Sequence, residues 1–196
     1  MKRLTLILVL GVSFSIVFSQ GWKETHVKLS AMRPAFPFSK LLGVATTPFH
    51  PIVEVGAAYQ WNKNEKNSWS QNVNIGFGYH RFLQSILPIY TTMEYKHCLK
   101  KKWQVGAFLG AGYLHSFPLN SQFKFVDGAY ERTGRSGKAQ VIIRMGLLVK
   151  YQRLSLAYEN FLQAPFVRSY VPLMPYNLLT IGYHMPFQIL SKKAKK

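Results

Sequence analysis

The feature that most constrains this chain is a two-residue alternation between apolar side chains and polar or small ones. It is clearest in residues 52–61, where one face would carry Val53, Val55, Ala57, Tyr59 and Trp61. Because successive side chains of a β-strand point to opposite faces, the pattern predicts a strand with two unlike faces. The polar segment 62–68 and a second alternating run at 69–80 complete a predicted hairpin.

The same alternation recurs along the rest of the chain. Further runs lie at residues 23–31, 88–98, 102–116, 138–151, 153–163 and 175–187. An even number of strands, each of about ten residues, is what a closed membrane-spanning barrel requires. The sequence therefore predicts an all-β protein: an eight-stranded antiparallel transmembrane β-barrel, arranged as an up-and-down meander.

The lengths of the connections give an orientation. Those after the second, fourth and sixth strands are short, at residues 62–68, 99–101 and 152–153. Those after the first, fifth and seventh span 20, 21 and 11 residues, and 83–87 is a brief exception after the third. Short periplasmic turns and longer extracellular loops are typical of outer-membrane barrels, so we expect both termini in the periplasm.

The aromatic residues fit this orientation. All four tryptophans fall at the predicted periplasmic strand ends, although Trp22 is out of phase with its strand. Aromatic rings gather where a barrel meets the membrane interface. The predicted girdle consists of Trp22, Trp61, Trp69, Trp103, Tyr151 and Phe187.

The first residues predict export. Lys2 and Arg3 precede an apolar run that ends at Phe18, and the small residue Ser19 follows. The run is shorter than a membrane-spanning helix needs, so we expect residues 1–19 to be a cleaved signal peptide. Residues 20–196 then form the barrel domain with a short basic C-terminal tail, located in the outer membrane of a Gram-negative cell.

One rival fold shares the alternation. In a soluble barrel of lipocalin type the apolar face lines the interior and the other face meets water. A solvated face is normally rich in Lys, Glu and Asp. Here the second face is mainly Gly, Asn, Ala, Ser and Gln, which favours the membrane barrel.

The leader, the alternating runs, the glycine-rich second face and the last strand, which ends in residues 183–187, together carry a resemblance. The chain resembles the small outer-membrane β-barrels of the OmpA-transmembrane and OmpX type, a porin-like architecture. Phe187 resembles the aromatic residue that closes the last strand in that family and serves as its assembly signal. Here the chain continues to Lys196, which departs from the pattern.

Ionisable residues on the inward phase predict a polar interior. They are Glu54, His80, Glu94, Lys96, Arg144, Lys150, Glu159 and His184. A two-residue turn at 152–153 would place Gly146 opposite Glu159 and Arg144 one diagonal step away. We therefore expect a lumen ion pair between Arg144 and Glu159, in a structural role, because unpaired buried charges are costly.

Two functions remain open from the sequence. The first is a structural, adhesive or surface-interaction role without transport chemistry, since side chains fill an eight-stranded barrel. The second is a lipid A or phospholipid acyl hydrolase that uses Ser116, His115 and Glu94. Adjacent strand residues point to opposite faces, so Ser116 and His115 could not both join one cluster without a bulge.

Charge indicates the partners. Without the leader, 23 Lys and Arg face seven Asp and Glu, a formal charge of +16. For an exported protein this favours membrane lipid or lipopolysaccharide over nucleic acid. The pairs His50/His80 and His26/His184 have no metal-ligand spacing. We expect a monomer with no metal and no cofactor.

Overall fold

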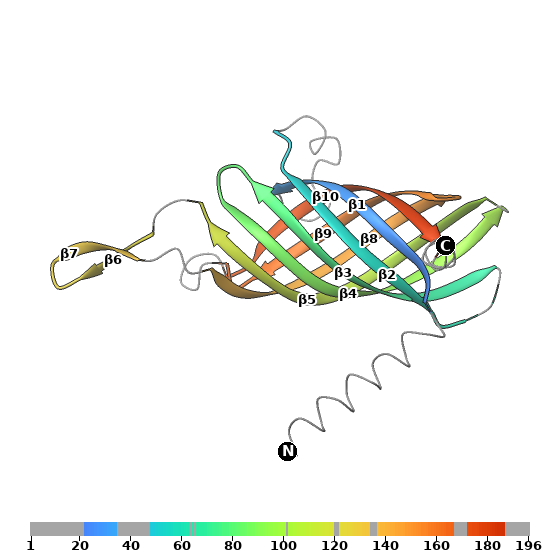
Figure 1. The fold of residues 1–196 in the computed structure, drawn as a ribbon, viewed down its shortest axis with the longest axis horizontal. Helices are drawn as coiled ribbons and strands as arrows, with labels where there is room; N and C mark the ends of the chain where they lie inside the picture. The colour runs from blue at the N-terminus through green and yellow to red at the C-terminus, as the bar shows by residue number, and fades with distance from the viewer. Residues whose placement is uncertain are drawn as a thin grey trace, which may run out of the picture.

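Figure 1 shows the fold in a computed structural model, which describes residues 22–34, 48–62, 64, 66–100, 102–119, 122–133, 137–166 and 172–186. Eight strands close into one antiparallel barrel in the order β1-β10-β9-β8-β5-β4-β3-β2. They are β1 (Trp22–Pro34), β2 (Pro51–Gln60), β3 (Asn67–His80), β4 (Gln84–Lys100), β5 (Trp103–Pro118), β8 (Lys138–Tyr151), β9 (Leu154–Ala164) and β10 (Met174–Pro186). No helix among the described residues is long and apolar enough to span a membrane.

Each alternating run of the sequence corresponds to one strand of this barrel, which confirms the predicted fold. Consecutive barrel strands pair antiparallel, and β1 pairs with β10 to close the ring. Closure leaves no unpaired strand edge, as a hydrocarbon environment demands of any β-structure.

The outer surface is apolar on every barrel strand. These large hydrophobic side chains are exposed: Val27, Leu29, Val53, Val55, Val73, Ile75, Phe77, Ile89, Met93, Leu109, Tyr113, Val141, Ile143, Leu147, Val149, Leu154, Leu156, Ile181 and Tyr183. A continuous apolar belt of this size is not stable in water. The barrel is therefore a transmembrane barrel, and the lipocalin alternative, with its apolar face inside, is wrong.

The connection between β3 and β4 differs from the sequence prediction. We expected a connection at 83–87, but the turn is Arg81–Leu83 and Gln84 already pairs with His80. Pro88 explains the error, because proline has no N–H to donate and usually begins a strand or lies at its irregularities. Here Pro88 lies inside β4, where the ladder to β3 is interrupted between the Ile75↔Ile89 and Gly78↔Ile86 pairs.

The two ends of the barrel are unlike. We call the end with the Gln152–Arg153 turn and the start of β1 the turn end, and the opposite end the hairpin end. From the hairpin end projects a separate two-stranded sheet of β6 (Gln122–Val126) and β7 (Ala129–Thr133) (Figure 1). Positive φ angles at Asp127 and Gly128 give its two-residue turn.

The interior of the barrel also differs between the turn end and the hairpin end. On the hairpin side it is filled by a buried cluster of Met32, Ile52, Ile86, Tyr90, Leu114, Ile142, Phe161, Tyr176 and Leu178. On the turn side most inward positions are charged, polar or glycine, among them Ser70, Glu94, Lys96 and Lys150, with a few apolar side chains such as Leu148. Residues 1–19, Phe187 and the basic tail lie outside the described residues, so the predicted leader, that girdle residue and the tail stay predictions.

Candidate functional site in the barrel lumen

A charged cluster crosses the middle of the lumen. Arg144 on β8 reaches Glu159 on β9, with Nη2 2.5 Å and Nε 3.1 Å from the same Glu159 oxygen, Oε2. Its Nη1 donates to Oε1 of Glu54 on β2, across the barrel. All three side chains are buried. The Arg144 guanidinium therefore links Glu159 on β9 to Glu54 on β2, two strands that do not pair with each other.

Aromatic rings cover this cluster on its hairpin side. The Arg144 Cζ lies 4.3 Å from the ring centre of Tyr90 and 5.9 Å from that of Phe161. A guanidinium over an aromatic face is attracted by the ring quadrupole, most strongly when water is excluded. The charged layer and the apolar cluster behind it are both buried inside the barrel and contact each other through Tyr90 and Phe161.

A second network lies nearer the turn end and centres on Glu24 of β1. Lys150 Nζ is 2.9 Å and 2.7 Å from the two Glu24 carboxylate oxygens. Lys96 Nζ lies 3.8 Å from Glu24 and 2.8 Å from Glu94. Asn72 donates to the other Glu94 oxygen at 2.8 Å. The buried Glu94 and the partly buried Glu24 thus each have an ammonium partner, as charges removed from water require.

Glu24 also contacts a histidine. Nδ1 of His184 on β10 lies 3.1 Å from Glu24 Oε1, and its Nε2 lies 2.9 Å from Ser155 Oγ on β9. The His26 ring centre is 5.5 Å from that of His184, and His26 Nε2 bonds Asn74 at 2.7 Å. Serine, histidine and glutamate therefore lie in one hydrogen-bonded line on three neighbouring strands.

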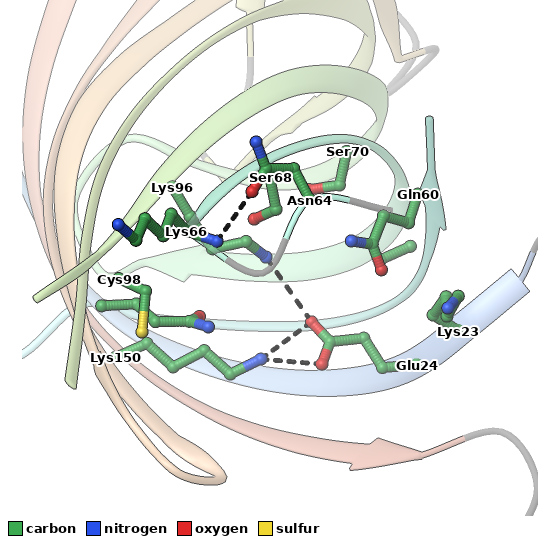
Figure 2. A pocket seen from close by; sticks show the side chains of 12 residues that line it. Lys23, Glu24, Gln60, Asn64, Lys66, Ser68, Ser70, Lys96, Cys98 and Lys150 are labelled. Carbon is green, nitrogen blue, oxygen red and sulfur yellow. Dashed lines mark hydrogen bonds and ion pairs between the residues drawn. The ribbon is translucent and has the colours of Figure 1, made fainter. Parts of the chain in front are cut away.

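A cavity opens beside this network at the turn end. Its volume is about 570 Å³. Figure 2 shows the ammonium groups of Lys96 and Lys150 directed at the Glu24 carboxylate inside it. Lys23 and Lys66 add two further positive charges to its wall, and uncharged polar side chains complete much of the lining: Gln60, Asn64, Ser68, Ser70 and Gln104. The cavity suits a ligand that carries negative charge.

The structure brings the predicted ion pair together but separates the three residues of the predicted hydrolase. Arg144 and Glu159 are brought together as described above. Ser116 is buried, with its hydroxyl 3.5 Å from the Lys138 carbonyl, whereas His115 Nδ1 lies 2.7 Å from the Tyr113 hydroxyl. Glu94 lies in the turn-end network, eight positions along β4 from the Ser116 partner Ile86, roughly 26 Å away at 3.3 Å per residue. Ser116, His115 and Glu94 form no common site.

The described girdle residues lie at the turn end. Trp103 and Tyr151 are paired across β5 and β8, with ring centres 4.8 Å apart. Trp61 and Trp69 are exposed. Trp22, out of phase in the sequence, follows a register shift between Trp22 and Glu24 and pairs with outward-facing Tyr59. This bulge moves the tryptophan onto the lipid-facing side.

Both histidine pairs noted in the sequence, His50/His80 and His26/His184, are in contact in the structure. The His50 and His80 rings stack with centres 3.7 Å apart at the hairpin end. Stacked rings direct their nitrogens outward and do not converge on a shared ion. Within the described part of the chain, no three His, Cys, Asp or Glu side chains are grouped to hold a metal.

Three participating residues were not identified from the sequence in these roles. Glu24 shares the inward phase of His26, and that phase could have identified it. Ser155 faces Lys150 across the tight turn, which also follows from the register. Glu54 was expected to point inward, but its contact with Arg144 depends on how far the strands tilt around the barrel, which alternation does not specify.

No family model and no curated protein matches the chain. Solved structures do resemble it. The N-terminal β-barrel domain of Pseudomonas aeruginosa OprF has 11% identity and a TM-score of 0.48, covering 85% of this chain and 100% of its own. Neisserial surface protein A has 7% identity and a TM-score of 0.48, covering 85% and 96%. The outer-membrane enzyme PagL has 9% identity and a TM-score of 0.48, covering 82% and 98%. The likeness is one of fold.

Proposed function

We propose that the protein is an integral outer-membrane protein with a structural, adhesive or other surface-interaction role, and that it conducts no solute. In this proposal the turn end and both termini face the periplasm, and the hairpin end faces outward. The signal peptide delivers the chain, and lipid and lipopolysaccharide surround a monomeric barrel.

The observation that most supports this role is the contrast between a filled lumen and a projecting hairpin. The Arg144 cluster and the apolar side chains behind it leave no room for a pore. The β6–β7 sheet pairs with no barrel strand, and Tyr130 on it is 75% exposed. A sheet held away from the barrel adds nothing to lumen packing, whereas it extends the surface available to a partner.

Surface labelling tests the orientation. An epitope tag inserted between Asp127 and Gly128 should be stained by antibody on intact cells, because this turn lies at the tip of the hairpin. A tag at Asn64, in the turn between β2 and β3, should be stained after the outer membrane is opened and not before. The reverse pattern would overturn the orientation. Heat-dependent migration on gels provides the folding control for both tagged proteins.

Two further measurements test the role. Single-channel recordings in planar bilayers should show no conductance for the purified barrel, and a steady open level would contradict a closed lumen. Adhesion of cells to a panel of protein-coated and glycan-coated surfaces should fall when residues 122–133 are deleted. Equal binding by cells with and without the hairpin would argue against a role for this element in surface interaction.

A further inference from the structure

The arrangement of Ser155, His184 and Glu24 has the connectivity of an activated nucleophile. The carboxylate lies at His184 Nδ1, so this nitrogen carries the proton and donates to Glu24. Nε2 then has a lone pair and accepts from the Ser155 hydroxyl at 2.9 Å. A serine bonded to a neutral imidazole that is itself oriented by a carboxylate is the arrangement used for acyl transfer.

The backbone makes room for this contact. Gly182 is the cross-strand partner of Ser155, and both lie on the inward face. A Cβ at position 182 would lie 2.5 Å from Ser155 Oγ and 3.5 Å from His184 Nε2. Any larger residue would therefore occupy the space that the serine hydroxyl uses. The three strands β9, β10 and β1 are consecutive in the barrel, which holds the three side chains on one rigid surface.

Ser155, His184 and Glu24 lie near the cavity at the turn end of the barrel. Ser155 is the second residue of β9 and is partly exposed, unlike the fully buried Arg144 cluster deeper in the lumen. Glu24 lines the 570 Å³ cavity, and so does Lys150, the cross-strand partner of Ser155. Cross-strand partners on one face have Cβ atoms about 5 Å apart. The Lys150 ammonium itself pairs with Glu24, the carboxylate that orients His184, so its positive charge belongs to the same network as the serine.

We propose that Ser155, His184 and Glu24 form a hydrolytic centre for acyl esters that carry a negatively charged group. The four lysines of the cavity wall outnumber the two carboxylates beside them, Glu24 in the lining and Glu94 next to Lys96, which favours an anionic substrate. Ser155 attacks the ester carbonyl while His184 takes its proton. His184 then returns the proton to the departing alcohol, and the acyl group stays on Ser155. Water, deprotonated by His184, releases the acid and restores the serine.

Covalent labelling tests the nucleophile directly. The full chain, expressed in a Gram-negative host and extracted in detergent, would be incubated with a fluorophosphonate, whose fluoride an activated serine displaces. Intact-mass and peptide analysis should find one phosphonyl group on Ser155. Ser155→Ala should abolish it, and His184→Asn should slow labelling about 100-fold through loss of the base. Glu24→Gln should slow it to a smaller extent.

Matched controls separate chemistry from folding. Ser116→Ala removes another buried lumen serine, at the hairpin end, and should leave labelling unchanged. Each variant must show the heat-dependent gel shift of a closed barrel. Absence of label in the folded wild-type protein, label that persists in Ser155→Ala, or equal rates in His184→Asn would each overturn the proposal.

The source of the substrate is then distinguished by hydrolysis assays. The anionic 4-nitrophenyl succinate monoester should be cleaved with a higher kcat/KM than neutral 4-nitrophenyl butyrate, and Lys66→Gln should reduce that ratio. Fatty acid released from phosphatidylglycerol vesicles would identify a lipid source. Cleavage of the succinate ester without lipid hydrolysis would identify a soluble one, and cleavage of neither would overturn the hydrolase.

Failure of this centre would leave the proposed surface role intact. That role depends on the hairpin end and its orientation, whereas the hydrolytic centre depends on three side chains at the turn end. The tag and labelling experiments therefore give independent outcomes.

Discussion

The two halves of the lumen use the same eight strands for opposite purposes. On the hairpin side, the inward positions of β4, β5 and β10 carry Ile86, Leu114 and Leu178, each at most 1% exposed. On the turn side, inward positions of β4 and β8 carry Lys96 and Lys150, beside a cavity. Dense apolar packing contributes stability, whereas a hydrated charged space costs it. One half of the lumen therefore closes the barrel, and the other is available for chemistry.

The largest loss of stability should follow from replacing Arg144, which lies at the boundary between the two halves of the lumen. Arg144→Met would leave Glu54 and Glu159 buried without a cation and should lower the free energy of unfolding by about 3–5 kcal/mol. Adding Glu159→Gln should recover part of this loss, and adding Glu54→Gln should recover more. Urea titrations in detergent, in which the gel shift reports the folded fraction, would measure the free energy of unfolding of each variant. Strictly additive losses would show that the three residues do not act together.

A matched pair on β5 compares the two halves. Leu114→Ala, in the hairpin-side cluster, removes a fully buried side chain and should cost about 2–4 kcal/mol. Gln104→Ala, on the same face of the same strand but at the cavity wall, should cost less than about 0.5 kcal/mol. The same urea titration serves both variants. Equal costs would mean that the turn-side half is packed as tightly as the other.

Gly182→Ala should separate stability from chemistry in the turn-side half. The new methyl group would meet a serine hydroxyl that can rotate away, so the loss of stability should stay within about 1 kcal/mol. Fluorophosphonate labelling of Ser155 should nevertheless fall sharply, because the rotated hydroxyl no longer faces His184. Labelling at the wild-type rate would show that Gly182 has no role in positioning the serine.

The smallest change in stability should follow from removing the β6–β7 hairpin. Deleting residues 122–133 removes a sheet that pairs with no barrel strand, and should change the free energy of unfolding by less than about 0.5 kcal/mol. The gel-shift titration used above would measure it. A loss above 2 kcal/mol would instead mean that the hairpin belongs to the folded unit.

Alternation was sufficient to predict the barrel because one residue of slippage would turn every apolar side chain inward. It predicted the strands of residues 138–151 and 153–163 with ends within one residue of the observed ones. It did not predict the β6–β7 hairpin, although Asp127-Gly128 is a strong turn signal. The flanking segments were interpreted as loop because their aromatic and charged residues also suit a surface loop.

The candidate site was harder to predict, for a geometric reason. Neighbouring strands joined by a tight turn have a fixed register, so the proximity of Arg144 to Glu159 followed from the sequence. The line from Ser155 through His184 to Glu24 includes β1, whose pairing with β10 joins opposite ends of the chain. No local turn specifies that register. The bulge after Trp22, in the ladder between β1 and β2, is a one-residue irregularity that a short alternating run does not reveal.

The seam between β1 and β10 also determines when the barrel can form. Thr25 and Met185, which face each other there, are separated by 160 residues. By the logarithmic dependence of loop entropy on length, joining them costs about 4 kcal/mol more than closing a two-residue turn. Strand β1, although made first, keeps an open edge until the last strand arrives. The newly made chain is therefore exposed to aggregation for the whole interval, and assembly should be slow and dependent on factors that shield that edge.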